Sequence, residues 1–184
     1  MRDPSAGLAV AEWPMASREL PMGFASASDA HALAEMSRDL IEAGLGWEYR
    51  SARIARMIGD PDTVALVARD DPRVAGFAVM TFGDERAHLV LLAVRAGHQR
   101  QGIARSLLAW LADSAQTAGM VSMHVELRAS NAAAFALYQS AGFVETLRVP
   151  GYYRGREAAV RMLRLLRSPC DALPTWRPPS FDRR

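Results

Sequence analysis

Leu91 to Ser114, LLAVRAGHQRQGIARSLLAWLADS, is the stretch from which the expected arrangement of this chain follows. An apolar run, residues 87–94, leads into it and has the character of a buried strand. Further along, four apolar side chains recur at the spacing of one helix face: Ile103, Leu107, Leu108 and Leu111. A strand, a short turn and a helix start are therefore expected in direct succession.

The turn between this strand and helix has the residues of an anion-binding site. A helix start leaves backbone N–H groups unpaired and carries partial positive charge. Gly102 and Ala104 allow a bulky anion to approach those groups, and Arg100 and Arg105 add cationic side chains. The pattern fits a pyrophosphate seat, and it also fits an ordinary connection that contains a glycine. The glycine triplet of a Rossmann site is absent, and a chain without lysine has no Walker A loop.

Composition sets limits on the class of protein. A chain of 184 residues with 50% hydrophobic and 23% charged residues is expected to form one globular domain, which we place at residues 19–167. A flexible N-terminal arm (1–18) and a Pro-rich C-terminal tail (168–184) flank it. The single cysteine, Cys170, excludes an internal disulfide, and no secretory signal or membrane span is apparent, so we expect a cytoplasmic protein. A net charge of +2 argues against nucleic acid as a partner.

The remaining pattern predicts alternating strands and helices. Asp70-Asp71-Pro72 is a strong turn signal between two apolar strands, and Gly119 and Gly142 are expected to end helices. Ser28 is a candidate helix N-cap. The predicted strands are 19–25, 63–69, 73–82, 87–94, 121–127, 143–148 and 158–165, and the predicted helices are 29–43, 48–58, 103–118 and 131–141.

Two groups of residues carry a resemblance to a known family. Gln99-x-x-Gly102-x-Ala104 after a strand resembles the acetyl-CoA motif of the GNAT acyltransferases. The later run Glu126–Ala134, followed by Ala136-Leu137-Tyr138, Gly142-Phe143 and Tyr152-Tyr153, is similar to the bacterial ribosomal-protein-alanine branch, over about residues 87 to 162. The resemblance implies an α/β (α+β) GNAT fold, in which about four helices flank a central mixed, mostly antiparallel twisted sheet of six to seven strands.

The resemblance also implies acetyl-CoA as co-substrate, with no metal. It assigns pantetheine to the backbone of Leu92, Ala93 and Val94, which must then lie on a strand that parts from its neighbour. It assigns pyrophosphate to Gln99, Arg100, Gln101, Gly102, Ile103, Ala104 and Arg105. Asn131 would contact the ligand, cap the following helix, or do both.

Two residues are implied to be catalytic. Glu126 matches the family's general base, which takes the amine proton directly or through water; the alternative is a surface carboxylate paired with Arg128 or another arginine. Tyr138 matches the acid that protonates the departing thiolate, and the alternative is an aromatic side chain packed beside Phe135.

The resemblance also implies that the acceptor is an amine, and a protein or peptide N-terminus is the leading expectation. Tyr152 and Tyr153 resemble the tyrosine pair of N-terminal acetyltransferases, although the preceding Pro150-Gly151 departs from the family pattern. Three further side chains are candidates for substrate binding, with structural packing as the alternative: Trp47, Tyr49 and His124. A small-amine acetyltransferase and a non-catalytic acyl-CoA sensor remain open, as do a monomer and a homodimer.

Overall fold

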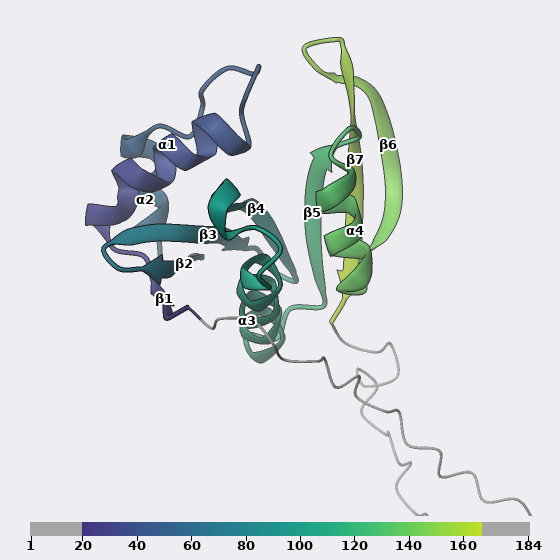
Figure 1. The fold of residues 1–184 in the computed structure, drawn as a ribbon. Helices are drawn as coiled ribbons and strands as arrows, with labels where there is room; N and C mark the ends of the chain where they lie inside the picture. The colour runs from purple at the N-terminus through teal and green to yellow at the C-terminus, as the bar shows by residue number, and fades with distance from the viewer. Residues whose placement is uncertain (1–19, 167–184) are drawn as a thin grey trace, which may run out of the picture.

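A computed structural model describes residues 20–166, which form a seven-stranded sheet in the order β1-β2-β3-β4-β5-β7-β6 (Figure 1). The strands are β1 (Met22–Phe24), β2 (Thr63–Asp70), β3 (Arg73–Phe82), β4 (Arg86–Val94), β5 (Ser122–Arg128), β6 (Val144–Tyr153) and β7 (Glu157–Leu165). The α-helices in this range are α1 (Ala30–Leu40), α2 (Ser51–Ile58), α3 (Ile103–Thr117) and α4 (Ala132–Ser140). The expected arm at 1–18 and tail at 168–184 lie outside the described residues.

The pairing of the strands confirms the predicted mixed, mostly antiparallel sheet. Every neighbouring pair is antiparallel except β4 and β5, which run parallel. Helices α1 and α2 cover one face of strands β2 to β4, and α3 and α4 pack on the opposite face of the sheet. Each face therefore has its own apolar core, and the sheet separates the two. Within residues 20–166, no helix is long and apolar enough to span a membrane.

Most predicted boundaries lie close to the observed ones. Gly119 and Gly142 both adopt φ of +84°, the left-handed conformation that ends a helix, as expected. The predicted N-cap at Ser28 is wrong. Ser26 begins the turn instead, and its N–H donates to the Asp29 carboxylate at 2.7 Å. Strand β6 also extends beyond 148 to Tyr153, because an edge strand tolerates proline.

Strand β4 contains a β-bulge that exchanges its two faces. Leu89 pairs with Met80 and Leu91 with Val79, so Val90 is an extra residue opposite no partner on β3. Leu89 consequently packs in the core beneath α3, whereas Leu91 packs in the core beneath α1 and α2. Strict alternation would have placed both leucines on the same face, since side chains in a strand repeat every two residues.

Strands β4 and β5 are paired over only part of their length. The parallel pairing begins at Arg86 with Ser122 and ends at Leu89 with Val125. Strand β4 continues to Val94 and β5 to Arg128 without pairing to each other, and Figure 1 shows the two strands diverging. From residue 90 onward, the edge of β4 that faces β5 is therefore not paired with β5. This separation of two neighbouring strands is what an amide-containing ligand requires in order to bond the backbone of β4.

Candidate active site

A groove of about 500 Å³ lies on the α3–α4 side of this parting. Gly102, with φ of +85°, precedes the first residue of α3, and no side chain caps the helix start. Arg100 also has positive φ, at 62°, so the turn curls tightly ahead of the helix. The groove is lined by Leu92, Ala93, Val94, His98, Gln99, Arg100, Gly102, Ile103, Ala104, Arg105, Ala133, Ala134, Ala136, Leu137, Tyr138 and Ser140. The arrangement directs helix-terminal N–H groups and arginines at one hollow, as a pyrophosphate requires.

The two glutamines of the motif hold the turn in place. The Gln99 side-chain amide donates to the Val94 carbonyl at 3.0 Å, and that of Gln101 donates to the Gly97 carbonyl at 3.1 Å. Gln99 also lines the groove, whereas Gln101 does not. Both side chains therefore shape the turn through its backbone carbonyls, a contribution that the sequence motif alone did not reveal.

Tyr138 lies on α4 and reaches the groove from the side opposite α3. Its side chain is buried against Phe143, with ring centroids 5.5 Å apart, and this burial raises the pKa of the phenol. The phenol is protonated at neutral pH, where its ordinary pKa of 10.0 would already keep the proton, and it carries a proton that it can donate. Asn131 caps α4, since its Oδ1 accepts from the Ala134 N–H at 3.0 Å, and it does not line the groove.

A second, larger hollow of about 920 Å³ lies on the α1–α2 side of the sheet. Leu91 lines this cleft, whereas its neighbour Leu92 lines the groove, so adjacent residues of β4 line different hollows on the two sides of the sheet. The cleft is bounded by the α1–α2 connection, β4, β5 and the β6–β7 hairpin. Its polar and charged lining residues are Glu42, Glu48, Tyr49, Arg86, His88, His124, Glu126, Tyr152, Tyr153, Arg154 and Arg161.

Glu126 projects into this cleft from β5, one residue beyond the last β4–β5 pair. Arg161 on β7 donates from Nε to Glu126 Oε2 at 2.8 Å, and its guanidinium lies 5.8 Å from the Tyr152 ring. A hydrogen bond with Glu126 raises the pKa of the Tyr152 phenol. Sequence reasoning offered Arg128 or another arginine as the partner; the partner is Arg161, and Arg128 pairs with Glu157 at 3.5 Å.

The two tyrosines of the hairpin form one aromatic corner of the cleft. Their rings meet edge to face with centroids 5.1 Å apart. Burial raises the pKa of Tyr153 to about 12, so this phenol is neutral and available as a hydrogen-bond donor. Arg128 lies over the Tyr153 ring at 5.7 Å and donates to the Ala43 carbonyl at 2.6 Å. It thereby connects the hairpin to the α1–α2 connection across the cleft.

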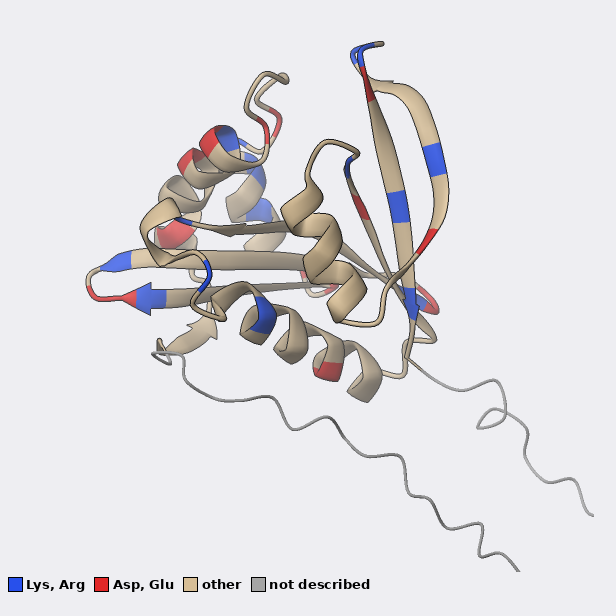
Figure 2. Ribbon diagram, turned by 45° about the vertical axis from the view of Figure 1, so that its right-hand side comes forward, with Lys and Arg blue, Asp and Glu red and all other residues tan. Residues whose placement is uncertain are grey.

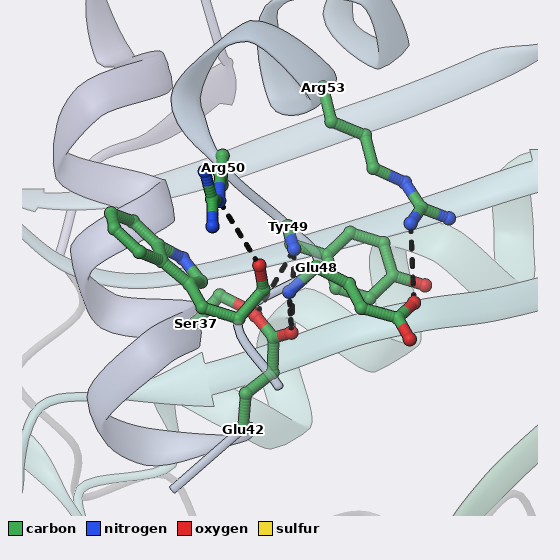
Figure 3. A network of polar contacts seen from close by, with 7 residues as sticks. Ser37, Glu42, Glu48, Tyr49, Arg50 and Arg53 are labelled. Atoms are coloured by element: carbon green, nitrogen blue, oxygen red, sulfur yellow. Dashed lines mark hydrogen bonds and ion pairs between the residues drawn. The ribbon is translucent and has the colours of Figure 1, made fainter. Parts of the chain in front are cut away.

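Buried Glu42 organises the opposite wall (Figure 3). Its carboxylate accepts from the Ser37 hydroxyl at 2.9 Å and from the Glu48 N–H at 2.6 Å. The Tyr49 N–H also donates to it, at 3.3 Å. These bonds fix the backbone that carries the Tyr49 ring into the cleft lining. Trp47 does not line the cleft; its side chain packs against the apolar core beneath α1 and α2, and the Arg38 and Arg50 guanidiniums lie 5.3 and 5.6 Å from its ring centroid.

Sequence reasoning missed several polar cleft residues, among them His88, Arg86, Arg161 and the buried Glu42. His124, which it did single out, lines the cleft and bonds the Ser122 hydroxyl through Nε2 at 2.9 Å. The polar positions of an amphipathic strand carry a weak signal, because such residues are usually only exposed to solvent.

Within residues 20–166, no group of three potential ligands is arranged to hold a metal ion. Figure 2 shows both signs of charge along the α1–α2 segment and the β6–β7 hairpin.

Comparisons with known proteins find relatives of this chain. The chain is 43% identical over 95 residues to the ribosomal protein bS18-alanine N-acetyltransferase of Salmonella typhimurium, a match that covers 50% of this chain and 64% of that protein. The enzyme of the same name from Escherichia coli K12 is 42% identical over 93 residues, covering 49% and 63%. In both matches the chain spans less than two thirds of the relative's length.

Solved structures extend the likeness to most of the fold. The crystal structure of the ribosomal-protein-S18-alanine N-acetyltransferase from Escherichia coli superposes with a TM-score of 0.72 and 28% identity, covering 84% of this chain and 98% of that chain. The Salmonella typhimurium protein yncA, solved with its cofactor acetyl-CoA, has the same fold, with a TM-score of 0.71, 22% identity and coverage of 81% and 95%. The sequence model of the acetyltransferase (GNAT) family matches residues 30–143. That match spans more than half of the chain, and the chain therefore belongs to the acetyltransferase (GNAT) family.

Proposed function

We propose that this protein is an acetyl-CoA-dependent N-acetyltransferase whose acceptor is the α-amine of a protein or peptide N-terminus. The main observation in support of the proposal is that β4 and β5 separate at a point that lies between the groove and the cleft. Leu92 to Val94 line the groove on one side, and Leu91 and Glu126 line the cleft on the other. A thioester held along the open edge of β4 could then be reached by an amine from the cleft.

The groove offers donors and acceptors suited to acetyl-CoA. The start of α3 at Gly102, together with Arg100 and Arg105, would hold the pyrophosphate. The open edge of β4 at Leu92, Ala93 and Val94 would bond the amide groups of pantetheine, as a neighbouring strand would. Acetyl-CoA, when bound, supplies the acetyl thioester that the amine attacks. Asn131, which lies outside the groove lining, would act as the cap of α4.

The chain supplies the two proton transfers that this chemistry requires. Glu126 would take the proton of the acceptor ammonium, directly or through water, because its carboxylate lies at the cleft side of the parting. Tyr138 would give a proton to the departing thiolate from the groove side. Its phenol is in the protonated form at neutral pH, since the ordinary pKa of 10.0 already lies well above that pH and burial raises it further.

The lining of the cleft supports a peptide rather than a polyamine. Three carboxylates (Glu42, Glu48 and Glu126) are matched by three guanidiniums (Arg86, Arg154 and Arg161), so there is no excess of negative charge to attract a polycation. A volume of about 920 Å³ is also near the upper end of the range for ligand clefts. Tyr152 and Tyr153 would bond the backbone of the first residues, and Tyr49 would cover them. The same acceptor is implied by the names of the bS18-alanine relatives.

The test is a CoA-release assay over a panel of acceptors. Peptides beginning with Ala, Ser and Met are compared with polyamines, free amino acids and aminoglycosides, and each peptide is paired with a copy whose N-terminus is blocked. We expect turnover with free peptides and none with the blocked copies. Turnover restricted to small amines would overturn the assignment of the acceptor. Acetyl-CoA binding by calorimetry without turnover on any acceptor would instead identify a sensor.

A further inference from the structure

His88 and Glu126 flank the point at which β4 and β5 part. His88 precedes the last pair, Leu89 with Val125, by one residue on β4, and Glu126 follows it by one residue on β5. His88 is itself in register with His124. Residues two apart in a strand share a face, so His124 and Glu126 project to the same side of β5, and all three side chains line the cleft.

The Glu126 carboxylate is already engaged by two donors. Arg161 Nε binds its Oε2 at 2.8 Å, and Tyr152 shares a hydrogen bond with it. A proton that came to rest on Glu126 would disrupt an ion pair of close geometry. The Glu126 carboxylate is well placed to attract the acceptor ammonium and to weaken its hold on a proton. A second group must then accept that proton.

His88 has the properties of that second acceptor. The walls of the cleft partly desolvate its imidazole and lower its pKa, so the ring is neutral at neutral pH. Glu126 opposes this effect and stabilises the imidazolium once it forms, whereas Arg161 disfavours it. His88 is nevertheless exposed within the open cleft, so a bound proton can leave to solvent.

The other ionisable groups around His88 come from four parts of the fold. Strand β4 contributes Arg86, β5 contributes His124, and the β6–β7 hairpin contributes Tyr152, Tyr153 and Arg154 in addition to Arg161. The α1–α2 connection contributes Glu42, Glu48 and Tyr49 across the cleft. Desolvation lowers the pKa of His124, as do Arg86 and His88, and one of its nitrogens is bonded to Ser122. Glu126 stabilises the imidazolium of His88, whereas the charges that act on His124 only disfavour its protonation, so His124 is less suited than His88 to take up a proton.

We propose that the proton drawn from the acceptor ammonium at Glu126 comes to rest on His88, so that the two residues act together as the general base. The inference rests on the proposed acetyl transfer. The transfer between them runs through water in the cleft, and it converts the neutral imidazole of His88 to an imidazolium while Glu126 stays ionised. The carboxylate thus holds the amine and stabilises the charge that develops on the ring.

The protons and electrons of the whole step balance. The ammonium loses one proton to His88 and becomes a neutral amine, whose lone pair forms the new C–N bond as the C–S bond breaks. Tyr138 protonates the departing thiolate, and the nitrogen loses a second proton as the amide forms, which restores the phenol. The net reaction releases one proton, which His88 passes to solvent.

The experiment compares the pH dependence of kcat for the parent, His88→Gln and a matched control, His31→Gln. His31 is an exposed histidine on α1 and lies outside the cleft lining. We expect kcat of His88→Gln to fall by about a hundredfold, with unchanged KM for acetyl-CoA. The parent should show an acidic limb with an apparent pKa below the ordinary histidine value of 6.5, and that limb should disappear in the variant. His31→Gln should match the parent.

Chemical rescue separates proton transfer from a structural role. Added imidazole should restore turnover to His88→Ala and should not restore it to Glu126→Gln, while thermal denaturation verifies that both variants are folded. If the parent turns over and His88→Gln has the same kcat and the same acidic limb, the inference is wrong although the proposed function stands. If the parent acetylates no amine, the proposed function fails and the inference fails with it.

Discussion

Replacing Glu42 by alanine should destabilise the fold and damage the acceptor cleft together. The Glu42 carboxylate is 6% exposed and accepts from Ser37, Glu48 and Tyr49 (Figure 3). Truncation leaves these donors without their acceptor at the end of α1. It also releases the backbone that places the Tyr49 ring against the cleft, so the consequences should reach acceptor binding.

The size of the effect follows from the hydrogen bonds. The bonds at 2.9 Å from Ser37 and 2.6 Å from Glu48 involve a charged acceptor, for which about 1.5–3 kcal/mol each is typical. Glu48 is exposed, so its N–H can turn partly to water, and we expect a net loss of about 2–4 kcal/mol. For a domain of this size the melting temperature should then fall by about 5–15 °C. Glu42→Gln keeps the shape and one acceptor oxygen, so a loss of about 1–2 kcal/mol is expected.

The assay is urea denaturation of the parent, both Glu42 variants and Glu35→Ala as the matched control. Glu35 is also a carboxylate of α1, but it is 45% exposed and its ion pair with His31 is long, at 3.6 Å, so its loss should change the free energy of unfolding by less than about 0.5 kcal/mol. The KM for the acceptor should rise in Glu42→Ala, while acetyl-CoA affinity stays unchanged because the groove lies on the other face of the sheet. A Glu42→Ala variant as stable as Glu35→Ala would refute the reasoning.

Four further outcomes test the groove and its helices. Gly102→Val should weaken acetyl-CoA binding by at least about tenfold in calorimetry, because a β-branched residue strongly disfavours φ of +85°; an unchanged affinity would remove the assignment of the pyrophosphate seat. Tyr138→Phe should retain acetyl-CoA affinity and lower kcat by at least about tenfold, and full activity would exclude the acid role. The raised pKa of Tyr138 also means that the unfolded chain loses this proton first as pH rises above 10.0, so the free energy of unfolding should fall there for the parent and fall less for Tyr138→Phe. Asn131→Ala should cost about 1 kcal/mol through the lost cap, whereas Asn131→Asp should keep the stability of α4, which thermal denaturation of the pair would check.

Local signals account for the part of the fold that sequence reasoning predicted. The turn at Asp70-Asp71-Pro72, the left-handed glycines at 119 and 142 and the cap at Asn131 each depend on a few neighbouring residues. The local sequence was therefore enough to predict each of these features. Ser28 shows the limit of such signals, because Ser26 was an equally good capping residue two positions away and the Asp29 carboxylate favoured it.

The parts that escaped prediction depend on contacts between distant segments. The bulge at Val90 is a mismatch between β4 and β3, and nothing in the apolar run 87–94 marks it. The faces that residues 91–94 of β4 present follow from that bulge. The place of His88 in the cleft depends instead on the pairing of β4 with β5, a contact between distant segments. Trp47 illustrates the converse: its aromatic character suggested a substrate contact, whereas its side chain packs against the apolar core beneath α1 and α2, with two arginines near its ring.

The division of β4 between two hollows has a practical consequence for engineering. Val90 and Leu91 border the cleft to which we assign the acceptor, and Leu92 to Val94 border the groove on the far side of the sheet. A combinatorial library that varies 90 and 91 together with Tyr49 would search for new acceptors while leaving cofactor handling untouched. An insertion or deletion between 89 and 92 would exchange the two sets of side chains, so chimeras with relatives should be joined outside strand β4.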